Sequence, residues 1–378
     1  MPRKPLPLHL QPGTVVSALP PDEPGDWKEV TTPEGLAYVR RLTQEERTRS
    51  ELSTGLGAFQ ILTAPADIGA EKALSLKGEL LDERRFTLLL DRTGMVLKPD
   101  GELLCILLRD RLSREMLDKI RPVVRKAARN AVAGANRTDA AGAGRVARER
   151  ADGSKAKMTG TPSKKQLKPA DFKRLKNAKD GTFGYNSRGM RGGQVYPCRI
   201  TRYDGALPSE LKLMAEFARE VGDVFRNSFA QQRWEAQFER VLKTPLSFVI
   251  RTPESPTVFT TITCNKSWRT AAHTDPGDLK EGFGVLACLG DFKGCDLVFP
   301  RYKTAARYRE GDVLLADVHE VHGNTPLLNP DGTKPKLDEE PERLVTVFYY
   351  QEKMDRCLST PEEEMEFVNN RKKGDPMF

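Results

Sequence analysis

The sequence predicts an α+β protein whose core is a sandwich or jelly roll of short strands. From Leu246 onward, short apolar runs rich in β-branched and aromatic residues are separated by Gly, Pro and Asp turns. These runs are LSFVI, TVFTTITC, FGVLACL, DLVF, DVLLADV and LVTVFYY. Many short strands joined by tight turns are typical of sandwiches and jelly rolls. Upstream segments with apolar residues at helical spacing indicate that helices flank this core.

The regions before the core are predicted from composition and periodicity. Prolines crowd the first residues and indicate a disordered start. The run RRFTLLLDRTGMVLKPDGELLCILL predicts a strand pair with a turn at Pro99–Gly101, and a helix is expected at about 113–132. A second helix follows Pro208, with Ser209 as its N-cap. The expected organisation is a disordered N-terminus (1–20), an α/β region (21–132), a basic flexible linker or insert (133–180), the core (181–355) and a C-terminal tail (356–378).

Composition excludes some classes of protein. Mean hydropathy is −0.54 and no long apolar run is present, which indicates a soluble chain without a membrane span. The first residues lack the apolar stretch of a secretory signal, so we expect a reducing compartment. The six cysteines are scattered without a CxxC pair. Neither a zinc ribbon nor a disulfide scaffold is therefore indicated, and we expect most of the cysteines to be buried thiols.

Positive charge is concentrated in one part of the chain. Between Arg121 and Val195, 19 Lys and Arg residues stand against 5 Asp and Glu residues, a local balance of +14. Because the whole chain carries +8, the remainder sums to −6 (8 minus 14). Few large apolar residues interrupt this stretch, so it cannot build a packed core. It is either a solvated insert or a nucleic-acid contact, and charge alone does not separate the two.

Histidine and aspartate residues in the strand region form a candidate metal site. The chain has 4 histidines, and three of them, His273, His319 and His322, fall among the predicted strands. His273 and Asp275 form an H-x-D pair before a Pro-Gly turn, and a second histidine 49 residues later (322 minus 273) completes a face of two histidines and one carboxylate. Residues 319 and 322 point to opposite sides of an extended strand, so only one can be a ligand. We choose His322, which Gly323 follows, and expect His319 to be exposed or to lie behind the ligands.

The ligand types indicate the metal and its co-substrate. A face of two imidazoles and one carboxylate leaves open positions on one side, as iron(II) requires for a bidentate oxo-acid and dioxygen. Zinc prefers a closed tetrahedron or a single open position. The distal carboxylate of an oxo-acid needs a buried cation, and Arg343, which opens the run RLVTVFYY, is the candidate. Asn265 and Arg269, upstream of the first histidine, are candidates for contacting the oxo-acid or the substrate.

The order of these motifs resembles the TET/JBP family of dioxygenases, which oxidise the methyl group of pyrimidines in DNA. The residues that carry the resemblance are Asn265, Arg269, His273-Thr274-Asp275, Gly290–Gly294, Leu297–Pro300, Gly311-Asp312, His322-Gly323 and Arg343. The upstream segment 184–197 is similar to fungal and algal members. The resemblance implies a double-stranded β-helix (jelly-roll) core. It also implies ligation of Fe(II) by His273, Asp275 and His322, and binding of 2-oxoglutarate by Arg343, Asn265 and Arg269.

The resemblance further implies a substrate and co-substrates. The expected reaction uses O2 and 2-oxoglutarate, and Asp278 keeps open the use of ascorbate, as in one algal branch of the family. The expected partner is DNA with methylated bases, with 5-methylcytosine as the first choice and N6-methyladenine as the second. Because the base must leave the stack to be oxidised, Trp268 and Tyr185 are candidate substrate contacts. Asp338 is another, although its acidic run is equally typical of a solvated loop.

Two other functions are compatible with the sequence. A protein or small-molecule hydroxylase on the same fold would be active without nucleic acid. A non-catalytic DNA-binding protein would use the basic stretch and would show salt-sensitive DNA binding without turnover. We expect a monomer that is nuclear if the host is eukaryotic, for which the KKQLK and FKRLK runs are basic clusters, and cytoplasmic otherwise.

Overall fold

The computed structural model describes residues 14–17, 27–32, 35–41, 59–130, 180–191, 194–201, 208–252, 255–335 and 341–370. The expected basic linker, apart from Asp180, lies outside these residues. Most of the expected disordered N-terminus lies outside them as well, but Thr14–Ser17 forms strand β1, which pairs with β3 (Gly35–Arg41). The third strand of that small sheet is β2 (Lys28–Thr32).

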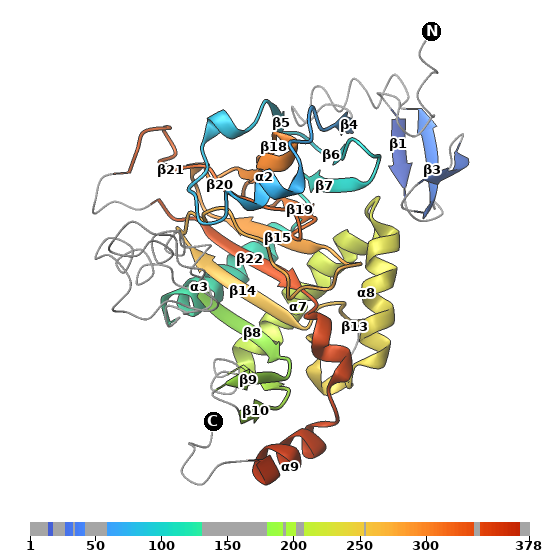
Figure 1. Ribbon diagram of the computed structural model, residues 1–378, viewed down its shortest axis with the longest axis vertical. Coiled ribbons are helices and arrows are strands. Elements are labelled where there is room, and N and C mark those ends of the chain that lie inside the picture. The colour runs from blue at the N-terminus through green and yellow to red at the C-terminus, as the bar shows by residue number, and fades with distance from the viewer. Residues whose placement is uncertain are drawn as a thin grey trace.

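A nine-stranded sheet forms the centre of the molecule (Figure 1). Its order is β11-β8-β14-β22-β15-β19-β7-β6-β4, and neighbouring strands are antiparallel except for β4 and β6. The strands are β4 (Gln60–Thr63), β6 (Gly94–Leu97), β7 (Leu103–Leu108), β8 (Asp180–Asn186), β11 (Arg199–Ile200), β14 (Thr261–Lys266), β15 (Gly284–Leu289), β19 (Val313–Ala316) and β22 (Leu344–Tyr349).

The sheet joins two regions that the sequence analysis separates. Strands β4, β6 and β7 come from the expected N-terminal α/β region, and β7 pairs directly with β19 of the core. The expected turn at Pro99–Gly101 joins β6 and β7 into a hairpin. The run before that hairpin forms β5 (Leu88–Leu90), which pairs instead with a strand of a second sheet. Residues 59–130 are therefore part of the core and not a separate extension.

A second, four-stranded sheet covers one face of the first. Its order is β20-β17-β18-β5, where β17 is Leu297–Phe299, β18 is Thr304–Ala306 and β20 is Gly323–Asn324. Between the sheets lies an apolar layer that includes Leu104, Leu286, Leu314 and Phe299. The two facing sheets form the predicted jelly-roll core, and β16 (Lys293–Gly294) pairs with β21 (Leu327–Leu328) at its edge.

Helices cover the opposite face of the main sheet (Figure 1). Apolar residues of α3 (Arg114–Asn130) and α7 (Pro208–Arg226) pack on the alternate residues of the strands, so β15 is buried on both sides. The helix expected at 113–132 is thus confirmed. The second helix already begins at Pro208, so the expectation that Ser209 is its N-cap is wrong. Helix α8 (Gln231–Lys243) follows α7 and packs against it.

One further expectation about secondary structure is wrong. The run LSFVI was expected to be a strand, but Leu246–Phe248 forms a 3₁₀ turn after Pro245, and only the strand-like runs that follow enter the sheets. The expected C-terminal tail contains helix α9 (Thr360–Asn370). A short run of β-branched or aromatic residues is compatible with a strand and with a buried turn, because strands and buried turns place the same residue types in the core.

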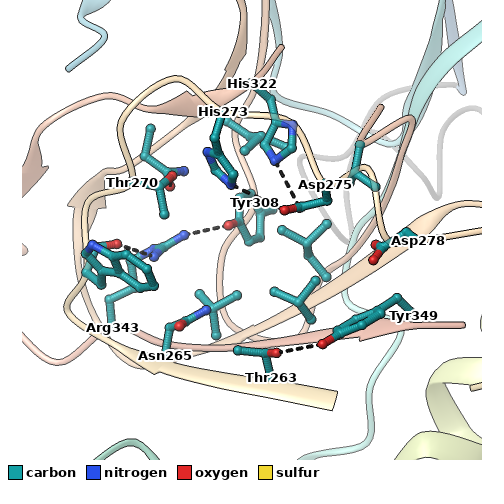
Figure 2. Close-up of a pocket in the computed structure, with 17 residues that line it drawn as sticks. Thr263, Asn265, Thr270, His273, Asp275, Asp278, Tyr308, His322, Arg343 and Tyr349 are labelled. Atoms are coloured by element: carbon teal, nitrogen blue, oxygen red, sulfur yellow. Dashed lines mark hydrogen bonds and ion pairs between the residues drawn. The ribbon is translucent and has the colours of Figure 1, made fainter. Parts of the chain in front are cut away.

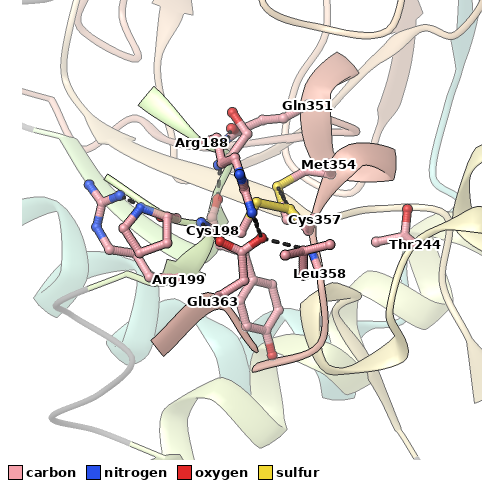
Figure 3. The surroundings of a disulfide bond; sticks show 12 residues. Arg188, Cys198, Arg199, Thr244, Gln351, Met354, Cys357, Leu358 and Glu363 are labelled. Carbon is pink, nitrogen blue, oxygen red and sulfur yellow. Dashed lines mark hydrogen bonds and ion pairs between the residues drawn. A yellow bond between two sulfur atoms is a disulfide. The ribbon is translucent and has the colours of Figure 1, made fainter. Parts of the chain in front are cut away.

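A disulfide joins Cys198 to Cys357, a pair that the sequence analysis does not single out (Figure 3). The two cysteines are separated by 159 residues, so nothing in their local sequence indicates the pairing. Beside the bond, the Glu363 carboxylate accepts hydrogen bonds from the backbone amides of Cys198 and Leu358 and from Arg188. These contacts fasten the start of α9 to the β8–β11 end of the sheet. The other four cysteines are buried thiols, as expected.

Among the described residues, no helix is long and apolar enough to cross a membrane.

Candidate metal centre and its pocket

The structure brings the three predicted ligands together between the two sheets. His273, Asp275 and His322 offer ligand atoms that all lie within 4.8 Å of one another (Figure 2). The two histidines face each other across a β-bridge in which each backbone amide donates to the other's carbonyl, at 2.8 and 2.9 Å. The Asp275 amide donates to the Val318 carbonyl at 3.0 Å. Residues 49 apart in sequence are thus held side by side by backbone hydrogen bonds.

Both imidazole rings have a fixed orientation. Nδ1 of His273 donates to the Ala271 carbonyl at 2.7 Å, and Nδ1 of His322 donates to the Glu320 carbonyl at 3.0 Å. These bonds place the proton on Nδ1, so the lone pair of each Nε2 is directed toward the site. The Nε2 atoms lie 3.9 and 3.5 Å from the two carboxylate oxygens of Asp275. Two neutral imidazoles and one carboxylate around a common point are a donor set that suits iron(II).

Glycine at position 323 allows the two histidine strands to approach. A Cβ atom at Gly323 would lie 3.0 Å from the backbone of Ala271, closer than an ordinary contact. Because Ala271 and Gly323 flank the β-bridge, a larger residue would push the ligands apart. This is the mechanical role expected of the glycine that follows His322.

His319 lies behind the ligands, outside the metal group. Its Nε2 donates to the Asp278 carbonyl at 3.1 Å, and its Nδ1 lies 3.6 Å from Asp317. The hydrogen bond with Asp317 raises the pKa of the imidazole above its ordinary value, although burial opposes this. Among the described residues, one other group has side chains close enough to hold a metal ion: Cys198, Cys357 and Glu363. The sulfur atoms of its two cysteines are joined in the disulfide.

Arg343 places a buried positive charge in the same pocket (Figure 2). The residue is 3% exposed, and its guanidinium donates to the Trp268 carbonyl at 3.3 Å and to the Tyr308 hydroxyl at 2.5 Å. Among the described residues, its buried Nε atom has no hydrogen-bond acceptor, and no carboxylate forms an ion pair with the guanidinium. A buried guanidinium that lacks an anionic partner is costly. The arrangement is therefore suited to receive a carboxylate from a ligand.

The remaining walls of the pocket carry polar groups. Asn265 is 8% exposed, and its side-chain oxygen has no hydrogen-bond partner among the described residues. Across the pocket, the Thr263 hydroxyl lies 3.3 Å from the Tyr349 hydroxyl. The cavity has a volume of about 110 Å³. Asp275, Asp278 and Tyr349 also line a second, wider cavity of about 470 Å³, so the two cavities share these three residues in their walls.

The other predicted residues are placed differently. Trp268 lines the metal pocket, as expected of a candidate substrate contact. Arg269 does not, because its guanidinium turns away and donates to the backbone carbonyls of Leu81 and Asn324. The Tyr185 ring packs edge-on against Phe248, 5.5 Å away between ring centroids, and does not line either cavity. Asp338 lies outside the described residues.

Some residues of the site were missed by reasoning from the sequence. Tyr308 supports the Arg343 guanidinium and also lines the pocket, yet nothing in the run AARYREGD distinguishes it. Thr263 and Asn324 point into the pocket from their strands. The alternation of side chains along a strand shows that one face is buried, but it does not show which face lines the pocket.

Comparison with known proteins identifies the domain that holds this site. Residues 184–352 match the Tet_JBP family, described as the oxygenase domain of the 2OGFeDO superfamily. Residues 184–352 form a TET/JBP-like oxygenase domain. This domain contains the three predicted metal ligands, Arg343 and Asn265. The family that the motif order predicts is therefore confirmed, together with the jelly-roll fold.

Relatives of the TET/JBP-like domain are much longer proteins. The bifunctional helicase and thymine dioxygenase JBP2 of Leishmania infantum is 51% identical over 76 residues, which is 20% of this chain and 7% of that protein. Thymine dioxygenase JBP1 of Leishmania braziliensis is 32% identical over 161 residues, 42% of this chain and 18% of that protein. The chain thus aligns with less than a fifth of either relative. Among solved structures, NgTET1 in complex with 5mC DNA aligns over 80% of this chain and 100% of its own, with 10% identity and a TM-score of 0.46.

Proposed function

We propose that this protein is an Fe(II)- and 2-oxoglutarate-dependent dioxygenase that oxidises the methyl group of a base in DNA. The 5-methyl group of cytosine is the first candidate substrate, with 5-hydroxymethylcytosine as the product. The observation that carries the proposal is the buried Arg343 guanidinium, which shares one pocket with the His273, Asp275 and His322 cluster. A metal triad alone fits many hydrolases and oxygenases. A triad beside a buried cation fits a bidentate oxo-acid.

The residues present fit the metal and its co-substrate. The Nε2 atoms of His273 and His322 and the carboxylate of Asp275 would hold Fe(II), which supplies the chemistry that activates O2 with 2-oxoglutarate. The distal carboxylate of 2-oxoglutarate would bind the guanidinium of Arg343, which Tyr308 and the Trp268 carbonyl hold in place. Asn265, whose side-chain oxygen lacks a partner, would contact the same ligand or the substrate.

The protein's own part is to position both reactants and to limit access by water. The Nδ1 hydrogen bonds fix the ligand rings, so little rearrangement is needed when a metal binds. The inner cavity is lined by apolar residues as well as polar ones, including Leu286, Leu297, Val345 and Val347. A confined, partly apolar site strengthens the attraction between Arg343 and a carboxylate.

The wider cavity is the proposed entrance for the base. It is lined by Asp275 and Asp278 on one side and by Tyr349 and Gln351 on the other, so a group inserted there reaches the metal ligand. A base in a duplex must be flipped out to enter such a cavity, at a cost of a few kcal/mol that contacts with the protein offset. The carboxylate of Asp278 is an acceptor that suits the N4 amino group of cytosine.

Thymine is a second candidate substrate, because the aligned Leishmania relatives are thymine dioxygenases. Its methyl group occupies the same ring position as that of 5-methylcytosine, and its N3–H is a donor that the same carboxylate of Asp278 could accept. The Asp278 carboxylate is therefore an acceptor suited to either 5-methylpyrimidine.

The test is mass spectrometry of nucleosides after incubation with Fe(II), 2-oxoglutarate and three matched DNA duplexes. The duplexes carry 5-methylcytosine, only unmodified thymine, or N6-methyladenine, and succinate is measured in parallel. The Asp275→Ala variant is the control. 5-Hydroxymethylcytosine or 5-hydroxymethyluracil with equimolar succinate would support a pyrimidine substrate and name it. Loss of N6-methyladenine would assign a demethylase instead.

Negative outcomes also decide between functions. Base oxidation only when ascorbate replaces 2-oxoglutarate would refute the co-substrate and the role of Arg343. Salt-sensitive DNA binding without any oxidised base or succinate would make the chain a binding protein and sink the proposal. Succinate formed only with protein or small-molecule substrates would assign a hydroxylase of another class.

A further inference from the structure

A cluster of buried charges lies next to the metal ligands. Lys98 is 6% exposed, and its ammonium lies 2.8 Å from Asp317 Oδ2 and 3.2 Å from Glu320 Oε1. Burial lowers the pKa of Lys98, but the carboxylates of Asp317 and Glu320 outweigh it and the pKa is raised overall. Lys98 is therefore a charged amine held between two carboxylates.

The lysine comes from outside the domain that the family comparison matches. It follows β6, whereas the TET/JBP-like domain spans residues 184–352. The side chain crosses from the 59–130 part of the chain to the turn 317–320, which precedes His322. A comparison restricted to the oxygenase domain would not include this residue.

The turn 317–320, which Lys98 contacts, is hydrogen-bonded to the candidate metal ligands. The Glu320 carbonyl accepts the Nδ1 proton of His322 at 3.0 Å and so orients that ring. The Val318 carbonyl accepts the Asp275 amide at 3.0 Å. The third ligand, His273, is bonded to the backbone of His322. A shift of this turn would thus move the atoms that position all of the ligands.

Further groups hold the Glu320 side chain. The Tyr302 hydroxyl donates to it at 2.7 Å, and Arg301 donates at 3.1 and 3.2 Å. The same arginine forms a bidentate pair with Asp67 at 2.9 Å, which also belongs to the N-terminal part of the chain. Asp317 is held by the backbone as well, since its amide donates to the Leu104 carbonyl at 3.0 Å. The cluster therefore fixes both ends of the turn 317–320.

We infer that Lys98 is a positioning residue for the metal site: it pins the turn 317–320 and thereby orients His322 and Asp275 for metal binding. Without the ammonium, the Asp317 and Glu320 carboxylates would lose the cation that they share, and each would keep one positively charged or titratable neighbour, His319 beside Asp317 and Arg301 beside Glu320. Two neighbouring carboxylates without a shared cation repel each other and move apart toward water, and this movement loosens the turn. The inference rests on the proposed metal site, and it concerns metal affinity rather than the choice of substrate.

The test compares the binding of Co(II) to the full-length wild-type protein and to Lys98→Met. Affinity is measured by calorimetric titration without oxo-acid or DNA, and the visible absorption of bound Co(II) reports the ligand geometry. Loss of a group that orients metal ligands typically weakens metal binding about 10–100-fold. We expect a loss in that range for Lys98→Met with an altered Co(II) spectrum, and recovery of most of the affinity in Lys98→Arg.

A matched control separates positioning from general stability. Arg240→Met removes a partly buried ion pair with Asp355, 2.5 Å apart, that has no contact with the turn 317–320. It should lower the melting temperature and leave Co(II) affinity and spectrum unchanged. If Lys98→Met fails to fold, Tyr302→Phe, which deletes only the hydroxyl on Glu320, provides the decisive measurement, and a several-fold loss of Co(II) affinity is expected.

The outcomes distinguish this inference from the proposed function. If wild type does not bind Co(II), the metal site itself is refuted. If wild type binds and folded Lys98→Met or Tyr302→Phe binds equally well with the same spectrum, only the positioning role of the cluster is refuted.

Discussion

Replacing Arg343 with methionine isolates the buried cation on which the proposed function depends. The side chain keeps a similar length, but the guanidinium and its two hydrogen bonds are lost. In the variant, the distal carboxylate of 2-oxoglutarate would be buried without a partner. Breaking a buried ion pair by removing one member costs about 3–5 kcal/mol, and each 1.4 kcal/mol is about tenfold in affinity. The dissociation constant for 2-oxoglutarate should therefore rise roughly a hundred- to several-thousand-fold.

The same substitution should have little effect on stability. Hydrogen bonds from a charged donor contribute about 1.5–3 kcal/mol each, whereas an unpaired buried charge costs several kcal/mol, so these effects nearly cancel in the ligand-free protein. We expect the melting temperature of Arg343→Met to change by less than about 4 °C. Arg343→Lys keeps a charge but loses the planar fork, so its affinity should be intermediate.

The assay is calorimetric titration of 2-oxoglutarate into the Co(II)-loaded protein without oxygen, with thermal unfolding measured in parallel. Arg309→Met is the matched control, because Arg309 lies nearby but already pairs with Asp296 at 3.1 Å. That variant should lose stability and keep its affinity for 2-oxoglutarate. A folded Arg343→Met protein that binds 2-oxoglutarate as tightly as wild type would refute the assignment of the carboxylate site.

Other parts of the structure give further expectations. His273→Ala and Asp275→Ala should each abolish base oxidation and weaken Co(II) binding while leaving the salt-dependent affinity for DNA unchanged; full turnover in either variant would contradict the ligand set. Cys198→Ala should lower the free energy of unfolding by about 2–5 kcal/mol under oxidising conditions, because the disulfide closes a long loop, and chemical denaturation of the reduced wild type should show the same loss. His319→Gln tests the raised pKa of His319. Because the folded pKa lies above the ordinary value of 6.5, the imidazolium contributes stability below that pH and loses it as pH rises through the folded pKa. The stability difference between wild type and His319→Gln should therefore be largest below pH 6.5 and shrink at alkaline pH, and a constant difference would argue against the Asp317 contact as its cause.

The sequence was informative where chemistry requires a residue type at a fixed spacing. His273 and Asp275, two residues apart, lie close enough to share one ion, and Arg343 directly precedes β22, whose Val345 and Val347 line the same pocket. The strand and helix runs were also found, because alternation and helical spacing record which face is buried. The runs that failed, such as LSFVI, are too short for a period to be read.

Long-range relations could not be predicted in the same way. Nothing near Cys198 indicates that Cys357 lies beside it, and Arg269 has the right position in the motif but bonds to the carbonyls of Leu81 and Asn324. Leu81 belongs to the N-terminal part of the chain, so the orientation of Arg269 depends on packing between segments far apart in sequence. A local pattern contains no information about such a partner.

The same packing bears on what constitutes the functional unit. Strand β19 leads into the turn 317–320. One edge of β19 pairs with β7, and all six residues of β7 are buried. On the other side of the site, Ala272 exchanges backbone hydrogen bonds with Gly78 and Glu79 at 2.7 Å, next to His273. Removing residues 59–130 would expose an apolar strand edge and remove contacts that hold the turn 317–320 and the segment before His273. The domain that the family comparison matches therefore contains all the candidate metal ligands, and residues 59–130 supply contacts that hold the turn 317–320 and the segment before His273 in place.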